Sequence, residues 1–215
     1  MLIRLFNAFA KITGWLPQFI CFRTKVYYED KAVQSRRVKG AAIIVSNHTS
    51  IFDYAVYLFV FFFRTLRTVM AEVLFEKKAL GPLLKLLGGI RVDRDANEYG
   101  FMSKCEKILQ KGGLVCIFPE GRLPKPGEER PLPLRPGAAY LSLAENVPVI
   151  PVYTNGSYFN KKRARVIIGT PIYPDDHTDP GKTDKENTIA VNAAIREKLL
   201  YLEKLLEERQ KGKQS

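Results

Sequence analysis

The chain has 215 residues, of which 46% are hydrophobic and 26% are charged. This length suits one domain with a sizeable core, and the composition excludes an intrinsically disordered chain. A net charge of +12 favours anionic partners, such as phosphorylated substrates, acidic carriers, anionic lipid or nucleic acid, without choosing among them. The three cysteines are too few and too irregularly spaced for a disulfide framework, and the two histidines leave few candidates for a histidine base.

The first 28 residues contain four basic side chains and no acidic one. Apolar residues recur there at helical spacing, namely Leu2, Leu5, Phe6, Phe9 and Ile12. Arg4 and Lys11 keep the apolar stretch well short of the roughly 20 residues that a membrane span requires. Two interpretations stay open, a helix lying in a bilayer surface and an amphipathic helix packed on the domain. We expect residues 1–28 to form a membrane-associating helical segment that precedes a domain of residues 29–215.

Apolar runs along the chain predict buried strands at 41–46, 67–71, 89–92, 113–118, 147–153 and 165–169. Segments of helical character lie between them, at about 51–63, 75–87, 97–111 and 136–145. Strands that alternate with helices form a mostly parallel central sheet flanked by helices. The sequence therefore predicts an α/β fold that follows an N-terminal amphipathic helical segment.

A last helix is expected from about Glu186 onward. Its apolar residues lie one turn apart, at Val191, Ile195, Leu199, Leu202 and Leu206, which is typical of a helix that docks one face on a domain. The loop before it, residues 173–184, carries acidic residues around His177. We interpret this loop as turns and helix caps, and not as a metal site.

The stretch SNHTSIFDY, residues 46–54, allows two interpretations that involve the same aspartate. Ser50 and Asp53 have the spacing of a capping box at a helix start. His48 and Asp53 instead suggest an imidazole held by a carboxylate, which would leave the other ring nitrogen free to act as a general base. Positions five apart on one regular helix point about 140° away from each other. The two side chains can therefore meet only if His48 stays in a loop and the helix begins near Ser50.

Polar residues also follow two other predicted strands, with Arg94 after the third and Glu120, Gly121 and Arg122 after the fourth. Arginines at two strand ends can bind a phosphate through charge-assisted, bidentate hydrogen bonds. A glycine between them allows a ligand to approach the backbone closely. The alternative in each case is a solvated charged loop.

Four motifs in order resemble those of glycerolipid acyltransferases of the 1-acyl-glycerol-3-phosphate acyltransferase type. They are NHTSIFD (47–53), GGIRVDR (88–94), FPEG (118–121) and VPVIPV (147–152), within a resemblance that covers about residues 38–170. One departure is visible in the third motif, because the family usually has Ser or Thr between the glycine and an arginine. Here Arg122 follows Gly121 directly.

The resemblance implies that His48 is the general base for the acceptor hydroxyl and that Asp53 orients it. It also implies that the glycerol phosphate of the acceptor is bound by Arg94, Glu120, Gly121 and Arg122. The departure makes the role of Arg122 less firm than that of Arg94, and it allows an acceptor other than lysophosphatidic acid. The implied reaction moves a fatty acyl group from acyl-CoA or acyl carrier protein to 1-acyl-glycerol-3-phosphate, which gives phosphatidic acid in phospholipid biosynthesis.

Direct attack of the acceptor on the thioester fits the sequence better than a covalent acyl-enzyme. The chain has no G-x-S-x-G motif, and Cys116 lies inside an apolar run where a thiol is normally inert. We expect no metal and no cofactor beyond the acyl donor.

The expected partners are a membrane lipid surface, a lysophospholipid acceptor and the acyl donor, at the cytoplasmic face of a membrane, as a peripheral or monotopic protein. Residues 29–215 would then be an acyltransferase domain that ends in an amphipathic helix. Two alternatives remain, a related acyltransferase with another lysolipid acceptor and a non-catalytic basic protein that binds membrane or nucleic acid. The second lacks support, because no nucleic-acid motif is present and the aromatic residues lie in apolar runs. We therefore expect no nucleic-acid partner.

Overall fold

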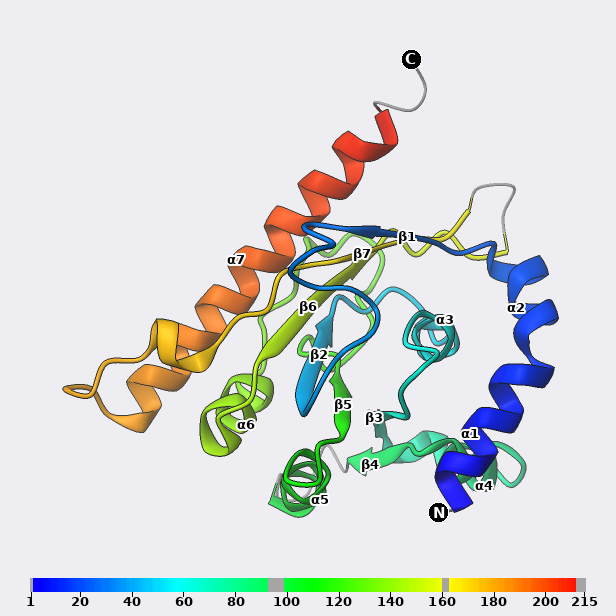
Figure 1. Cartoon of the computed structure of the whole chain (residues 1–215), viewed down its shortest axis with the longest axis horizontal. Helices are drawn as coiled ribbons and strands as arrows, with labels where there is room; N and C mark the ends of the chain where they lie inside the picture. The colour runs from blue at the N-terminus through cyan, green and yellow to red at the C-terminus, as the bar shows by residue number, and fades with distance from the viewer. Residues whose placement is uncertain (1, 93–98, 160–162, 212–215) are drawn as a thin grey trace.

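The computed structural model describes residues 2–92, 99–159 and 163–211. A seven-stranded sheet crosses its centre in the order β1-β7-β6-β2-β5-β3-β4 (Figure 1). The strands are β1 (Lys25–Tyr28), β2 (Ala42–Ser46), β3 (Leu66–Ala71), β4 (Ile90–Val92), β5 (Leu114–Ile117), β6 (Val149–Thr154) and β7 (Arg165–Ile168). Neighbouring strands pair in parallel except for β6 and β7, which are antiparallel. The predicted α/β class with a mostly parallel sheet is confirmed.

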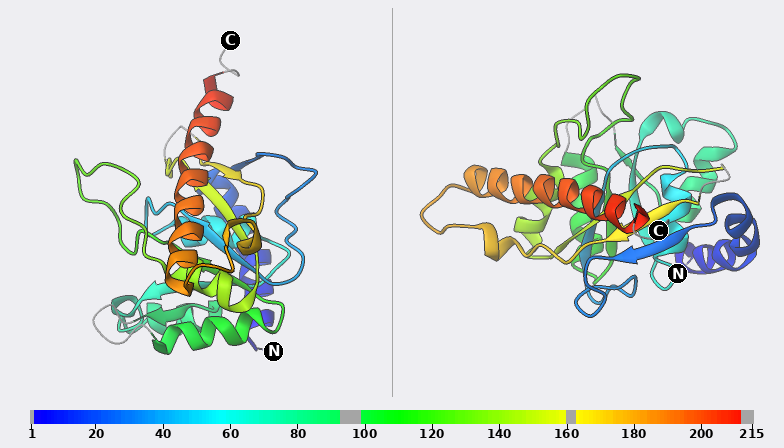
Figure 2. Two further views of the ribbon diagram at one scale, coloured as in Figure 1. Left: turned by 90° about the vertical axis from the view of Figure 1, so that its left-hand side faces the viewer. Right: turned by 90° about the horizontal axis from the view of Figure 1, so that it is seen from above.

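Helices cover both faces of the sheet (Figure 1). Two precede it, α1 (Leu2–Thr13) and α2 (Trp15–Phe22), and the others are α3 (Asp53–Val60), α4 (Leu80–Leu87), α5 (Tyr99–Leu109), α6 (Gly137–Glu145) and α7 (Asp184–Lys211). Two short 3-10 helices, η1 (Glu72–Leu74) and η2 (Pro174–His177), interrupt the connections. Figure 2 shows α7 crossing the sheet and projecting beyond it at its C-terminal end.

Strand β2 lies at the centre of the sheet, and all five of its residues are buried. Its side chains alternate between the two faces, so that Ile44 packs into the cluster formed with α3 while Ile43 packs into the cluster formed with α5, α6 and α7. A strand covered on both faces carries a continuous apolar sequence, which is what the run AAIIVS predicts. The apolar stripe of α7 is buried from Val191 to Leu206, as its spacing predicts.

Helix α1 has its polar side inside and its apolar side outside. Asn7 and Lys11 are almost fully buried, at 1% and 3% exposure. Asn7 Nδ2 donates to the carbonyl oxygen of Leu87 at 2.7 Å, at the end of α4. Lys11 Nζ donates to the carbonyl oxygens of Phe61, Phe62 and Arg64 at 3.3, 3.0 and 2.7 Å, just beyond α3. The polar face of α1 thus binds carbonyl groups at the C-terminal ends of two other helices, where the last turn leaves carbonyls without partners inside the helix.

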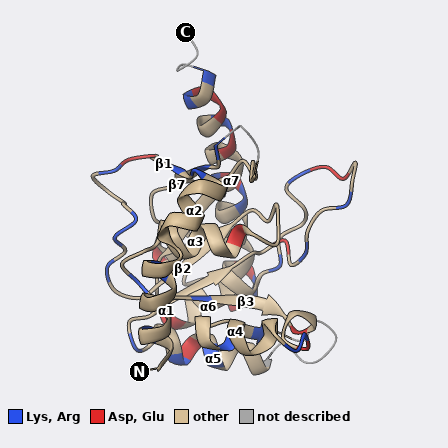
Figure 3. Ribbon diagram, turned by 90° about the vertical axis from the view of Figure 1, so that its right-hand side faces the viewer, with Lys and Arg blue, Asp and Glu red and all other residues tan. Residues whose placement is uncertain are grey.

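The opposite face of α1 and the length of α2 leave large apolar side chains exposed. They are Leu2, Leu5, Phe9, Ile12, Trp15, Leu16, Phe19 and Ile20, each at least 55% exposed. Figure 3 shows this side of the molecule, where the ribbon of α2 carries no charged position. In the described part of the chain no helix combines the length and the apolar content needed to cross a bilayer. Leu2, Leu5, Phe9 and Ile12 thus face away from the domain, while Asn7 and Lys11 of the same helix contact it.

The ends of three neighbouring strands lie level with one another. Val45 of β2 pairs with Ile117 of β5 on one side and with Pro151 of β6 on the other. These three strands are parallel, so their carboxyl ends meet at one edge of the sheet, which is where sites gather in open α/β sheets. The segments that follow β2, β5 and β6 form the site described next.

Candidate active site

His48 and Asp53 are in direct contact. His48 lies in the loop after β2, Asp53 is the first residue of α3, and His48 Nδ1 is 2.8 Å from Asp53 Oδ2. The side chain of Asp53 is fully buried, while that of His48 is 20% exposed. A carboxylate on Nδ1 favours the tautomer that carries its proton there, so Nε2 is left as the acceptor nitrogen. The ring of His48 stacks on Phe118, with ring centroids 4.3 Å apart.

The carboxylate of Asp53 accepts five hydrogen bonds. Oδ2 accepts from His48 Nδ1 and from the backbone N–H groups of Thr49 and Ser50, at 2.7 and 2.9 Å. Oδ1 accepts from the hydroxyl groups of Thr49 and Tyr158, at 2.8 and 2.6 Å. Burial raises the pKa of this carboxyl, but the hydrogen bonds from His48, Tyr158, Ser50 and Thr49 outweigh burial and hold the pKa below its ordinary value. Asp53 is therefore a buried anion.

The two interpretations of SNHTSIFDY prove compatible, because one carboxylate performs both tasks. Asp53 reaches back to the backbone of Ser50, as in a capping box. The reciprocal bond is missing, since Ser50 Oγ accepts from Phe52 N at 3.2 Å and α3 begins only at Asp53. The later helix start keeps His48 outside the helix, which is the condition that the geometry required.

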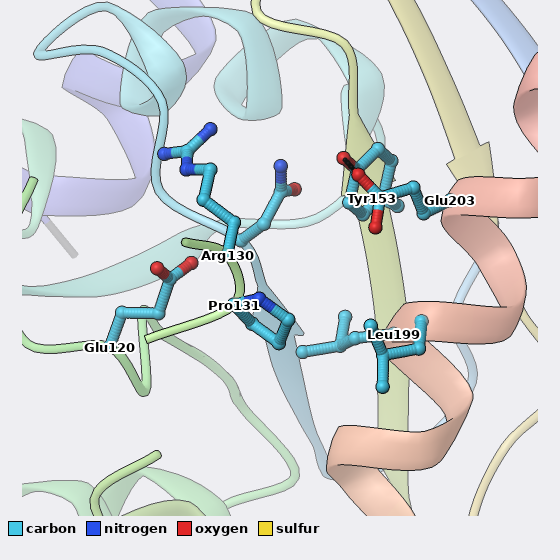
Figure 4. A pocket seen from close by; sticks show the side chains of 8 residues that line it. Glu120, Arg130, Pro131, Tyr153, Leu199 and Glu203 are labelled. Carbon is cyan, nitrogen blue, oxygen red and sulfur yellow. Dashed lines mark hydrogen bonds between the residues drawn. The ribbon is translucent and has the colours of Figure 1, made fainter. Parts of the chain in front are cut away.

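The loop after β5 holds the backbone of His48 on both sides. Glu120 is 5% exposed, and its carboxylate accepts from the backbone N–H groups of His48 and Leu132 at 3.1 and 3.2 Å. The guanidinium of Arg130 donates to the carbonyl oxygen of His48. Figure 4 shows Glu120 and Arg130 side by side at one end of a small pocket, with Tyr153 and Glu203 together at the other. Both carboxylate oxygens of Glu120 are thus occupied by backbone donors.

Gly121 adopts a left-handed conformation with φ of +70°. A Cβ atom at this position would lie 2.7 Å from Nε of Arg135, so the glycine gives room for that side chain as well as the turn. Gly121 also lines the large cavity next to His48. Any larger residue here would disturb both the turn and the packing of Arg135.

Of the two arginines that were predicted to bind phosphate, only Arg122 lies within the described residues. Arg94 lies outside the described residues. Arg122 forms a bidentate ion pair with Glu128, with nitrogen–oxygen distances of 2.7 and 2.8 Å. Hydrogen bonds from Arg122 and from the backbone of Lys125 lower the pKa of Glu128 to about 2. An anionic ligand of Arg122 would therefore have to compete with an ionised carboxylate.

An apolar cavity of about 460 Å³ has His48 in its lining. Its walls come from α3, β3 and α4, with lining residues that include Leu58, Val69, Met70, Leu80, Leu84 and Leu87. Near the histidine the lining passes to Phe118 and Gly121. A cavity of this size and character suits a slender apolar ligand whose reactive end lies at His48.

Two other chemistries can be checked against the described residues. Burial raises the pKa of the Cys116 thiol to about 12, so this sulfur stays protonated at neutral pH and is a poor nucleophile. Within residues 2–92, 99–159 and 163–211, no three His, Cys, Asp or Glu side chains gather as a metal-binding group. The loop around His177 forms turns, with Asp179 Oδ1 accepting from Gly181 N at 2.8 Å.

Fold and site together define an α/β protein with a histidine–aspartate pair whose histidine lines an apolar cavity. The chain belongs to the acyltransferase family, because the family model described as Acyltransferase matches residues 23–155. The family resemblance predicted from the four motifs is confirmed.

Curated relatives agree with this family. Over 140 residues the chain is 28% identical to the 1-acyl-sn-glycerol-3-phosphate acyltransferase of Bacillus subtilis, which covers 63% of this chain and 67% of the relative. Over 167 residues it is 29% identical to the human 1-acyl-sn-glycerol-3-phosphate acyltransferase beta, which covers 74% of this chain and 58% of the relative. The chain therefore spans little more than half the length of the human protein.

A solved structure shares the fold. The crystal structure of the 1-acyl-sn-glycerophosphate (LPA) acyltransferase PlsC from Thermotoga maritima superimposes with a TM-score of 0.59, covering 91% of this chain and 78% of the other. Sequence identity between the two is 19%, so this likeness speaks for the fold alone.

Proposed function

We propose that this protein transfers a fatty acyl group from an acyl thioester to the free hydroxyl of 1-acyl-glycerol-3-phosphate, which gives phosphatidic acid. Family membership and the names of both curated relatives support this reaction. The observation that carries the proposal is the contact between His48 Nδ1 and buried Asp53, with His48 also lining the apolar cavity.

In the proposed reaction His48 is the general base and Asp53 orients it. Nε2 takes the proton of the acceptor hydroxyl while the hydroxyl oxygen attacks the thioester carbonyl carbon. The new carbon–oxygen bond forms, the carbon–sulfur bond breaks, and the proton passes from the imidazolium to the leaving thiolate. Asp53 stabilises the imidazolium between these steps, because an ionised carboxylate 2.8 Å from Nδ1 favours the positive charge.

The apolar cavity suits the fatty chain of the donor or of the acceptor. Its lining from α3, β3 and α4 is almost entirely aliphatic and aromatic, and burial of each methylene group contributes about 0.8 kcal/mol to binding. Polar chemistry is left at the His48 end. This division fits a substrate with an apolar chain and a reactive polar head.

Arg94 and Arg122 are the proposed ligands of the acceptor phosphate. Gly121 directly precedes Arg122 in the sequence. Glu120 is expected to act through the backbone of His48 and not by touching the phosphate. The ion pair between Arg122 and Glu128 favours a second candidate, an acyltransferase for a different lysolipid head group. If Arg122 binds the phosphate, Glu128→Gln should lower the KM for the phosphorylated acceptor, whereas Arg122→Gln should raise it.

We further propose that residues 1–28 bind the cytoplasmic face of a membrane and make this a peripheral or monotopic protein. Residues 29–215 would then form the acyltransferase domain. The exposed apolar face of α1 and α2 supports membrane binding, because an apolar surface of that extent is disfavoured in water and suits a lipid interface. Phe9→Glu should weaken flotation with anionic liposomes. Ile189→Glu is the matched control, since Ile189 is equally exposed but lies on α7, on the other side of the sheet (Figure 1).

The proposed reaction is tested by offering the purified full chain several lysolipids, each with acyl-CoA and with acyl carrier protein as donor. Formation of phosphatidic acid from lysophosphatidic acid, detected by mass spectrometry, is the expected result. Transfer to another lysolipid alone would favour the second candidate. No transfer with any pair would contradict an acyltransferase of lysolipids.

A further inference from the structure

Tyr158 touches the proposed catalytic pair from a distant part of the chain. It lies in the loop after β6, where it is 8% exposed, and its hydroxyl donates to Asp53 Oδ1 at 2.6 Å. The two residues are 105 positions apart. Tyr158 lies outside the four sequence motifs, and the proposed reaction assigns it no role.

The loop that carries Tyr158 is built to approach the pair closely. Gly156 has φ of +65°, and a Cβ atom there would lie 2.7 Å from Cβ of Thr49. Glycine therefore allows this loop to pack directly against the residue that follows His48. Thr154 adds a second polar contact, with its Oγ1 3.3 Å from the Tyr158 hydroxyl.

Tyr158 fixes the side of the carboxylate that His48 does not touch. Oδ2 faces the imidazole, while Oδ1 has two hydroxyl donors, Thr49 and Tyr158. With Oδ1 held from two directions the carboxylate plane cannot rotate, so Oδ2 stays aimed at Nδ1. Alignment of this kind matters for rate, because a base must be oriented correctly when the hydroxyl attacks.

The ring of Tyr158 is held in turn by helix α2. Phe22, the last residue of α2, is 7% exposed and meets the Tyr158 ring edge to face, with ring centroids 5.6 Å apart. Phe22 also contacts Phe52 and Phe159, at 6.2 and 5.1 Å. Two side chains, Phe22 and Tyr158, therefore join the helix with the exposed apolar surface to the carboxylate of the pair.

We propose that Tyr158 is a positioning residue for the His48–Asp53 pair and that Phe22 of α2 sets the position of its hydroxyl. This inference rests on the proposed acyl transfer. It extends that proposal, because it makes the alignment of the base depend on the N-terminal helices.

The test is a double-mutant cycle on the full chain with lysophosphatidic acid and acyl-CoA. Tyr158→Phe keeps the ring and its contact with Phe22 but removes the donor. Loss of a hydrogen bond to a buried charge should lower kcat about tenfold with KM unchanged. In an Asp53→Ala background, where no carboxylate is left for the hydroxyl to hold, the same change should have an effect of at most about twofold, since residues that act as a unit are not additive. Tyr140→Phe is the control, because that tyrosine is 48% exposed on α6.

Several results would overturn the proposal. One is a kcat of Tyr158→Phe within about twofold of wild type, and another is a change confined to KM. A third is the same tenfold loss in the Asp53→Ala background, which would place the effect elsewhere. Phe22→Leu should lower kcat in the same direction as Tyr158→Phe. An unchanged kcat in that variant would remove α2 from the proposal.

A readout without turnover separates this inference from the proposed function. In a His177→Gln background the remaining imidazole is that of His48, and its modification by diethyl pyrocarbonate can be followed by absorbance. Tyr158→Phe should slow this modification relative to Tyr140→Phe. If the wild-type protein transfers no acyl group, the proposed function fails. The rate of His48 modification then tests the positioning role of Tyr158 by itself. Equal rates in the two variants would overturn the positioning role.

Discussion

Replacing Asp53 with asparagine isolates the charge of the pair. The amide oxygen can take the place of Oδ2 and keep the donors His48 Nδ1, Thr49 N and Ser50 N. The amide NH2 then faces the hydroxyls of Thr49 and Tyr158, which can turn to accept. Folding and the Nδ1 tautomer should therefore survive, while the attraction between carboxylate and imidazolium is lost.

The size of the effect follows from the geometry. With Nδ1 and Oδ2 2.8 Å apart, the charge centres lie about 4 Å apart, which is worth about 4 kcal/mol at an effective dielectric constant near 20. At about 1.4 kcal/mol for each factor of ten, kcat should fall about 1,000-fold. Thiol release from acyl-CoA at saturating acceptor measures kcat, and circular dichroism checks the fold. A folded Asp53→Asn variant with kcat within about tenfold of wild type would refute the electrostatic role of Asp53.

Three further predictions concern α1, the cavity and the sheet edge. Lys11→Met should lower the free energy of unfolding by roughly 2 kcal/mol, because three carbonyl groups lose their hydrogen bond to Lys11 and, among the described residues, only that of Phe61 keeps a backbone donor. Lys185→Met, at an exposed position, should leave the stability unchanged, and equal thermal melting of both variants would contradict this. Met70→Trp should remove room for about two methylene groups from the cavity. The kcat/KM for the longest acyl-CoA should then fall about tenfold relative to shorter ones. An unchanged chain-length profile would argue against binding of the acyl chain in this cavity. Burial raises the pKa of Glu29, but hydrogen bonds from Thr170 and Lys198 outweigh burial, so the pKa in the folded state is lowered. The stability that Glu29 contributes is therefore present above its ordinary pKa and is lost as the pH falls. Urea unfolding should show the gap between wild type and Glu29→Gln closing from pH 7 to about 3, and a constant gap would refute the linkage.

Much of the fold could be predicted because central parallel strands leave a plain signal. Runs such as AAIIVS and GLVCIF are buried on both faces, so they are apolar throughout. The edge strand β1 was not predicted, because its four residues KVYY follow directly on a helical pattern and only one of them is buried. Helix α4 begins at Leu80, later than the predicted 75, since turns and bends over residues 75–79 follow the 3-10 helix of Glu72–Leu74.

The site could be predicted in part, and the limit is set by distance along the chain. His48 and Asp53 are close in sequence, so helix geometry alone could state when they meet. Arg130 contacts His48 from 82 positions away and Tyr158 contacts Asp53 from 105 positions away, and no spacing rule reaches that far. The inverted amphipathic character of α1 is also invisible in the sequence, because apolar periodicity does not say which side of a helix faces the protein.

His48→Ala tests the central claim most directly. The variant should bind acyl-CoA and melt like wild type, because the imidazole ring is partly exposed, and it should form no measurable phosphatidic acid from lysophosphatidic acid and acyl-CoA. Phosphatidic acid formation at the wild-type rate would contradict the assignment of His48 as the general base.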